Sequence, residues 1–339
     1  MTSVPAGDLN RVPKAAKASE AGGFHRIAVP ENRHDPFLPL GVAAISTEHI
    51  ELGTSVAIAF PRSPMVVANT AWDLQLSSRG RFVLGLGPQI RPHNERRFSV
   101  PWSAPAPRLR EYVNALRAIW RCWQLGEKLD FRGEHYNFTL MIPNFSPEPV
   151  DVPSVPVSLA AIGPNSLRLS GEVADGVQIH PFCTRSYLEK VCVPLIEEGM
   201  AKTGRKRENF EIQGGGFVAT GPDDEAVAKA VELVRYRVAF YGSTPSYWPT
   251  LDHHDLGDLG RKLNKMTKAG QWDDIAAEVS DDVLARFAAI GRHDEIGAEI
   301  DARFGGIVDV IGGEPGLPRD LIEDIGRLPC GFSRFVSQW

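Results

Sequence analysis

The stretch Arg81-Phe82-Val83-Leu84-Gly85-Leu86-Gly87 is a short apolar run that predicts a buried strand. The helical segment Pro64 to Ser77 precedes it, and before that helix Ile50 to Ala59 predicts another strand. Alternating strands and helices favour a parallel sheet with crossover helices. The two glycines could suggest a dinucleotide-binding fingerprint, but Ile90 stands where its third glycine belongs, and no helix follows directly. We expect the small residues instead to let a flat ligand approach the backbone at the mouth of a barrel.

The same alternation extends along most of the chain. Strands are predicted at 25–29, 50–59, 81–87, 155–161, 176–180, 210–220 and 307–311. The helices predicted around them cover 8–21, 38–46, 64–77, 108–125, 166–174, 187–202, 223–240 and 294–304. An eighth strand must lie within Thr2 to Ala6, where only Ser3-Val4 is suitable. The pattern therefore predicts an α/β protein with a (β/α)8 TIM barrel, and a doubly wound open sheet is the alternative.

Residues 241–287 stand outside this alternation and contain Ser243 to Pro249 and a stretch of mixed helix. Insertions after barrel strands usually lie over the C-terminal mouth, where ligands bind. We therefore expect a single domain over residues 1–339, with 241–287 as an insertion region or lid near the C-terminal face.

Composition argues against several classes of function. The formal net charge of the 339 residues is -5, and the basic residues are scattered, which argues against a nucleic-acid surface and against docking on anionic membranes. There is no run of about 18 apolar residues and no secretory signal at the N-terminus. The four cysteines form no CxxC pair and are interpreted as reduced, buried thiols of a cytoplasmic protein (Cys122, Cys183, Cys192 and Cys330).

Polar residues follow two predicted strands at the ends that would face the mouth. Glu31 and Asn32 come after the strand at 25–29, and His180 ends the strand at 176–180. A histidine in this position is well placed for ligand contact, although it can equally bond a neighbouring carbonyl.

The segment Ala160 to Ser166 joins a predicted strand to a helix. Backbone N–H groups at a helix start favour an anion, so a phosphate could bind there. The alternative is a plain helix cap by Asn165 or Ser166 without a ligand. His253-His254 has no carboxylate or thiol at metal-ligand spacing, so we expect these side chains to be solvated and predict no metal site.

Five pieces of sequence, in their order along the chain, resemble the luciferase-like flavin and deazaflavin oxidoreductases. They are Ile50 to Val56, Ser77 to Gly87, Arg108 to Glu111, Phe131 to Tyr136, and Val173 to Gly176. Phe240 to Pro245 also resembles an actinobacterial branch assigned to coenzyme F-420. The resemblance implies an eight-stranded barrel with a flavin or deazaflavin ring at its mouth, and a homodimer.

The resemblance also implies site residues. A bulge with a non-prolyl cis peptide, here Ser55–Val56, would support one face of the ring, and the cofactor phosphate would lie near Gly163. The cofactor-binding residues implied are Thr54, Ser55, Val56, Gly87, Gln89, Ala161, Ile162, Gly163, Pro164, Asn165 and His180. The catalytic candidates are Glu31, Asn32 and His180.

Two positions depart from the pattern of the family. Asn32 stands where many members have histidine, and Ile90 stands where sugar-phosphate dehydrogenases carry glutamate, which argues against glucose 6-phosphate as substrate. We predict an oxidoreductase that transfers a hydride between coenzyme F-420 and a small organic substrate. The alternatives are a reduced-FMN-dependent monooxygenase and a non-catalytic flavin-binding barrel.

Overall fold

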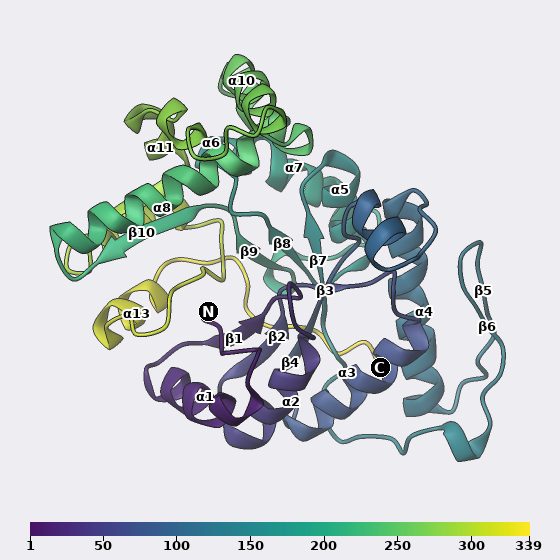
Figure 1. Ribbon diagram of the computed structural model, residues 1–339. Coiled ribbons are helices and arrows are strands. Elements are labelled where there is room, and N and C mark those ends of the chain that lie inside the picture. The colour runs from purple at the N-terminus through teal and green to yellow at the C-terminus, as the bar shows by residue number, and fades with distance from the viewer.

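Parallel strands form the centre of the molecule in the order β1-β2-β4-β7-β8-β9, in a computed structural model that describes residues 1–339 (Figure 1). The strands are β1 (Arg26–Val29), β2 (Glu51–Thr54), β4 (Phe82–Gly87), β7 (Val157–Ala161), β8 (Gly176–Ile179) and β9 (Glu211–Gly214). A short strand, β3 (Ala57–Ile58), follows β2 and also pairs with β4. The predicted parallel α/β sheet is confirmed.

The strand expected within Thr2 to Ala6 is reduced to one bridge. Thr2 lies parallel to Ile27, its N–H donates to the Arg26 carbonyl at 2.8 Å, and its own carbonyl accepts the N–H of Ala28 at 2.8 Å. A strand this short shows no alternation of side chains in the sequence, because only the backbone of one residue takes part in the pairing.

At the opposite edge, the strand predicted at 307–311 is likewise a single bridge, between Val310 and Gln213. The amino group of Met1 donates to the Ile311 carbonyl at 2.6 Å. Backbone hydrogen bonds thus connect β1 to Thr2, and Met1 to the segment that lies beside β9. Because these contacts link the two edges of the sheet, the sheet is curled.

Helices cover the outside of the curled sheet (Figure 1). Those of the first two thirds are α1 (Val12–Ala21), α2 (Phe37–Ser46), α3 (Pro64–Ser77), α4 (Pro105–Leu125), α5 (Pro164–Val173), α6 (Arg185–Tyr187) and α7 (Val193–Ala201). Helix α3 begins where the Ser63 hydroxyl accepts the N–H of Met65 and Pro64 takes the first position, both common at helix starts. Leu109, Val113 and Leu116 of α4 are buried in the main core, as their spacing predicts.

The strand predicted at 210–220 is in fact two strands. Gly214 and Gly215 interrupt it with φ of 88° and 97°, and a Cβ on Gly214 would lie 2.3 Å from the Ile179 carbonyl oxygen. Only glycine adopts this backbone without strain. After the turn, β10 (Phe217–Gly221) leaves the main sheet and pairs in parallel with β11 (Ala288–Arg292), which the sequence did not predict.

Residues 217–292 form a smaller layer around β10 and β11, at the upper left of Figure 1. Its helices are α8 (Asp224–Gly242), α9 (Trp248–Asp252), α10 (Gly257–Lys268) and α11 (Asp281–Phe287). Fourteen buried residues give the layer an apolar core, to which Phe182 contributes from the loop after β8. The layer is thereby attached at the C-terminal end of β8.

The remaining elements lie at the periphery. A hairpin of β5 (Phe131–Arg132) and β6 (Asn137–Phe138) projects at the right edge of Figure 1. Helices α12 (Ile296–Phe304) and α13 (Arg319–Gly326) precede the C-terminal segment.

None of the helices combines the length and apolar composition that crossing a membrane requires. No disulfide is present, and of the four cysteines only Cys330 is exposed, contrary to the expected burial.

Candidate functional site

The C-terminal ends of the parallel strands bring together the segments predicted to bind a planar ring. Ile58, just after the bulge, pairs with Gly87. A Cβ added to Gly87 would lie 2.7 Å from Val56 Cγ2 and 3.4 Å from Ala160 Cβ, so only a residue without a side chain fits there. Ala160 precedes the turn that leads to Gly163. The bulge at 54–56, Gly87 and the turn at 160–163 therefore lie side by side at the C-terminal end of the sheet, which we call the rim.

The bulge at Thr54-Ser55-Val56 is held by buried hydrogen bonds. The Thr54 hydroxyl donates to the Gly85 carbonyl at 2.6 Å and accepts the Gly85 N–H at 2.8 Å. The Thr54 carbonyl accepts from Gln178 Nε2 at 3.1 Å. The Ser55–Val56 peptide bond is cis, as the resemblance implies. These bonds fix the backbone at the centre of the rim.

The helix start after β7 carries no side-chain cap. Gly163 is the cap residue of α5, Pro164 takes the first turn, and neither Asn165 nor Ser166 caps the helix, contrary to the alternative interpretation. A Cβ on Gly163 would meet nothing within 4 Å, and the Asn165 side chain is exposed. The first N–H groups of a helix lack partners within it and attract anions. This corner of the rim is therefore open and rich in hydrogen-bond donors.

His180 lies next to this corner, after β8, whose Ile179 pairs with Ala161 of β7. Its Nδ1 accepts the N–H of Phe182 at 3.0 Å, and its ring centroid lies 4.3 Å from that of Tyr241 and 4.7 Å from that of Tyr247. Burial lowers the pKa of His180 to about 4. Because Nδ1 supplies a lone pair, the neutral ring carries its proton on Nε2. His180 is therefore a neutral donor, and it does not bond a neighbouring carbonyl through Nδ1.

Glu31 and Asn32 have different surroundings. Glu31 Oε2 accepts the N–H of Ile58 at 2.7 Å and pairs with Arg62 Nη1 at 2.7 Å, and the side chain is 8% exposed. The Asn32 side chain is exposed, and the backbone carbonyl of Asn32 accepts from Arg97 Nη2 at 2.7 Å. Glu31 thus ties the loop after β1 to β3 and to the loop before α3, and a catalytic role for either residue stays a prediction.

Gln89 follows Gly87 with a φ of 58°, which is uncommon for a residue with a side chain. Its Oε1 accepts the N–H of Ile90 at 2.9 Å. The amide nitrogen makes no bond within the chain, which leaves a donor at this position on the rim.

Tyr241 and Tyr247 were not among the predicted site residues. Their rings lie 5.5 Å apart and enclose His180 together with Phe182. Burial raises the pKa of Tyr247, so its phenol stays protonated. The run of aromatic residues from Phe240 to Trp248 was a signal in the sequence, but nothing in its spacing indicated that it would reach His180.

Two groups of possible metal ligands have structural partners. The Glu111 carboxylate accepts the N–H groups of Glu134 and His135 at 3.0 and 2.8 Å, and so ties α4 to the β5–β6 hairpin. His254 Nε2 lies 2.7 Å from the Thr184 hydroxyl. His253 Nε2 lies 2.9 Å from the Ser186 hydroxyl, so the expectation that the histidine pair is merely solvated is wrong for both residues, which are half-buried and join the end of α9 to α6.

Residues 1–309 match the family model described as luciferase-like monooxygenase. The chain belongs to this family. The chain is therefore an enzyme, and the non-catalytic barrel is not supported.

Among its relatives is the uncharacterized protein Rv1360 of Mycobacterium tuberculosis, 47% identical over 307 residues, with 91% of this chain and 90% of the relative covered. The 5,10-methylenetetrahydromethanopterin reductase of Archaeoglobus fulgidus is 27% identical over 323 residues, with 92% of both chains covered.

Solved structures of low identity share the fold. The coenzyme F420-dependent tetrahydromethanopterin reductase from Methanopyrus kandleri superimposes with a TM-score of 0.76 at 20% identity and covers 97% of both chains. The oxygenating constituent of 3,6-diketocamphane monooxygenase from Pseudomonas putida, in complex with FMN, gives 0.65 at 16% identity, with 94% and 92% covered. The curled sheet is thus the one found in luciferase-like enzymes.

Proposed function

We propose that this enzyme transfers a hydride between coenzyme F-420 and a small organic substrate. The observation that carries the proposal is the rim on which Val56, Gly87 and the start of α5 lie around the C-terminal ends of the strands. Relatives add support, since the Archaeoglobus fulgidus protein is a reductase and the Methanopyrus kandleri structure is that of an F420-dependent enzyme. The substrate of this chain is proposed only as a class.

The residues on the rim fit a flat ring that carries a phosphate. The open corner at Gly163 offers the N–H groups of Asn165 and Ser166 to an anion, and no side chain of the protein occupies it. The cis-bonded Val56 lies against Gly87 and would support one ring face, with Gln89 donating at the edge. Coenzyme F-420, when bound, supplies the hydride-carrying chemistry.

The contribution of the chain is to bind, orient and exclude water. His180 Nε2–H can donate to a carbonyl or hydroxyl oxygen without carrying charge, because burial keeps the ring neutral. Tyr241 and Tyr247 shield it from solvent. The Glu31–Arg62 pair holds the loop after β1 beside the bulge. Positioning of this kind can supply much of the catalytic effect when a cofactor carries the reaction.

The proposal includes the organisation of the molecule. With Thr2 and Val310 as very short first and eighth strands, the curled sheet would be a (β/α)8 barrel within a single domain of residues 1–339. Residues 241–287 would act as a lid, because Tyr247 already contacts His180. Apolar side chains exposed on α2 and α3 (Leu38, Ile45 and Val66) would suit the interface of a homodimer, which light scattering of the purified protein would test.

A reduced-FMN-dependent monooxygenase is the second candidate, favoured by the fold shared with the FMN complex. Three mixtures of the purified enzyme, each with and without oxygen, separate the two: reduced F-420 with carbonyl and nitro compounds, oxidised F-420 with alcohols, and reduced FMN with all three classes. We expect substrate-dependent oxidation or reduction of F-420 without oxygen. Turnover that requires both FMN and oxygen, with no binding of F-420, would overturn the first proposal.

A further inference from the structure

A cavity of about 490 Å³ lies at the other end of the sheet, away from the rim. His25, Glu51 and Glu211, which border it, stand at the N-terminal ends of β1, β2 and β9. Fifteen of its 26 lining residues are hydrophobic, and they come largely from the segment between α12 and α13, from α13 and from the C-terminal segment. This volume is in the range of small-molecule sites, roughly 300–1,000 Å³. No predicted site residue borders the cavity, which is therefore distinct from the proposed redox site.

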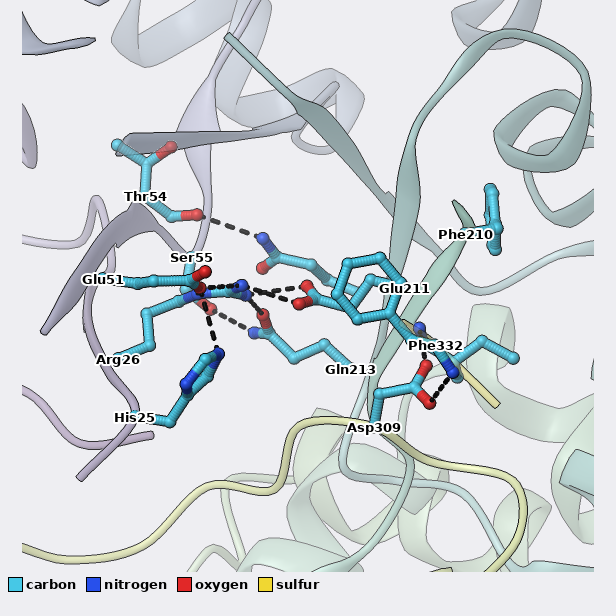
Figure 2. Close-up of polar contacts among 12 residues, drawn as sticks. His25, Arg26, Glu51, Thr54, Ser55, Phe210, Glu211, Gln213, Asp309 and Phe332 are labelled. Carbon is cyan, nitrogen blue, oxygen red and sulfur yellow. Dashed lines mark hydrogen bonds and ion pairs between the residues drawn. The ribbon is translucent and has the colours of Figure 1, made fainter. Parts of the chain in front are cut away.

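The polar end of the cavity is built around one arginine (Figure 2). Arg26, 1% exposed, donates to Glu211 at 2.7 and 2.6 Å and to Glu51 Oε2 at 2.9 and 2.5 Å. His25 Nε2 lies 3.2 Å from the same Glu51 oxygen. Although burial opposes it, the positive charge of Arg26 and the His25 contact lower the pKa of Glu51 to about 2. Glu51 is thus ionised, and it shares with Glu211 a single guanidinium that does not line the cavity.

Glu51 retains binding capacity on the cavity side. Its Oε1 makes no hydrogen bond within the chain, whereas both oxygens of Glu211 are occupied by Arg26. The Glu51 side chain is 28% exposed, and Glu51 is one of the residues that line the cavity. An ionised carboxylate oxygen accepts hydrogen bonds only, and its strongest partners are charged donors.

The other charges near the cavity do not cancel this one. Asp309 is occupied by Arg207 at 2.9 Å and by the N–H groups of Ile212 and Phe332. Burial lowers the pKa of the Met1 amino group to about 5, so it is neutral at pH 7. Arg334 borders the cavity with an exposed side chain, where solvent screens it. Apart from His25, no charged partner is therefore left for the free Oε1 of Glu51 beside the apolar walls.

We propose that this cavity binds a small molecule with an apolar chain and a primary ammonium group, the ammonium at Glu51 Oε1 and the chain among Leu321, Ile325 and Phe332. An alkylammonium matches both features, since its charge meets the carboxylate and its chain is removed from water by the apolar wall. A neutral alcohol would lack the charge, and a carboxylate would be repelled.

The test is calorimetric titration of the full-length protein, free of redox cofactor, with hexylammonium, hexan-1-ol and hexanoate. We expect hexylammonium to bind about tenfold tighter than the alcohol, a difference within what charge-assisted hydrogen bonding provides, and hexanoate not to bind. In Glu51→Gln the preference should disappear, and in the matched control Glu48→Gln, an exposed glutamate outside the cavity, it should remain.

Ile325→Trp supplies a second test, because it fills the apolar part of the cavity without touching the Arg26 cluster. Binding of both hexylammonium and the alcohol should fall, while the thermal unfolding midpoint shows that the variant is folded. Equal binding of all three compounds, no binding of hexylammonium, or an unchanged preference in Glu51→Gln would overturn the inference. None of these outcomes depends on F-420, so the redox proposal is tested separately.

Discussion

Arg26 and Glu211, 185 positions apart in the chain, form a two-bond ion pair across the inside of the curled sheet, with Nη1–Oε1 at 2.7 Å and Nη2–Oε2 at 2.6 Å (Figure 2). The two side chains are 1% and 0% exposed. Gln213 continues the polar contacts towards the rim, because its Oε1 accepts from Arg26 and its Nε2 donates to Ser55 Oγ, both at 3.3 Å. The pair thus connects the first and last long strands of the sheet.

Glu211→Gln should destabilise the fold strongly. Arg26 would keep only Glu51, whose side chain is 28% exposed, and would lose its fully buried two-bond partner, so we expect the free energy of unfolding to fall by about 2 kcal/mol, measured by urea denaturation. The control is Glu198→Gln, which breaks the Arg168 pair at 2.6 Å with side chains 38% and 55% exposed, and should cost less than about 1 kcal/mol. Equal losses in the two variants would show that the buried pair has no special role.

The sequence predicted those strands whose side chains show a pattern. The apolar run at 81–87 appears as β4, and Pro64–Ser77 is a helix at the predicted bounds. It also placed strands within Thr2 to Ala6 and at 307–311, but could not show that each is reduced to one bridge, because a single backbone bridge leaves no mark on the side chains. The break in 210–220 was readable, since three consecutive glycines follow Gln213 and glycine favours such turns.

Contacts between distant segments were beyond the sequence. Two pieces of the family resemblance, Arg108 to Glu111 and Phe131 to Tyr136, turn out to be one unit, since Glu111 accepts N–H groups of the hairpin. A Cβ on Gly133 would lie 2.2 Å from Glu111 Oε2, so a side chain there would displace the carboxylate from these N–H groups. The periodicity of apolar residues predicts helices and strands. Which carboxylate contacts which loop depends on how those elements pack in three dimensions.

The close approach of α5 and α7 yields another prediction. Gly199 allows it, because a Cβ there would lie 2.0 Å from the Arg168 carbonyl oxygen. Gly199→Ala should therefore force the helices apart and lower the free energy of unfolding by about 3 kcal/mol. Gly297 in α12, where a Cβ meets nothing within 4 Å, is the control, and its change to alanine should be neutral or stabilising by up to about 1 kcal/mol. Denaturant titration of both variants checks this, and a tolerated Gly199→Ala would contradict the backbone contact.

His180 should make stability depend on pH. Burial lowers its pKa to about 4 from the ordinary 6.5, so between these values the unfolded chain binds a proton that the folded protein does not. Protonation of the unfolded chain therefore lowers the free energy of unfolding as the pH falls below 6.5. The loss reaches about 3 kcal/mol near pH 4 and is absent well above pH 6.5. His180→Gln should accordingly lose less stability than the wild type between these values.

The measurement for His180 is urea denaturation at both ends of that pH range, with His49→Gln as the control, because the His49 side chain is 86% exposed. The control should follow the wild type. If His180→Gln follows the wild type as well, the imidazole is not held neutral by burial.

Asn165→Asp tests the start of α5 as a phosphate site. The change places a negative charge on an exposed side chain in the first turn, next to Gly163 and the uncapped N–H groups. An aspartate there interacts favourably with the helix dipole, so the fold should not suffer, but it repels a bound phosphate. We expect the Kd for FMN, used as a phosphorylated probe, to rise roughly fivefold, which corresponds to about 1 kcal/mol. Riboflavin, which lacks the phosphate, should bind the two proteins alike, and Asn144→Asp, exposed in the short 3-10 helix Pro143–Phe145, should change neither value. A phosphate held elsewhere on the rim would leave the FMN affinity of Asn165→Asp equal to that of the wild type.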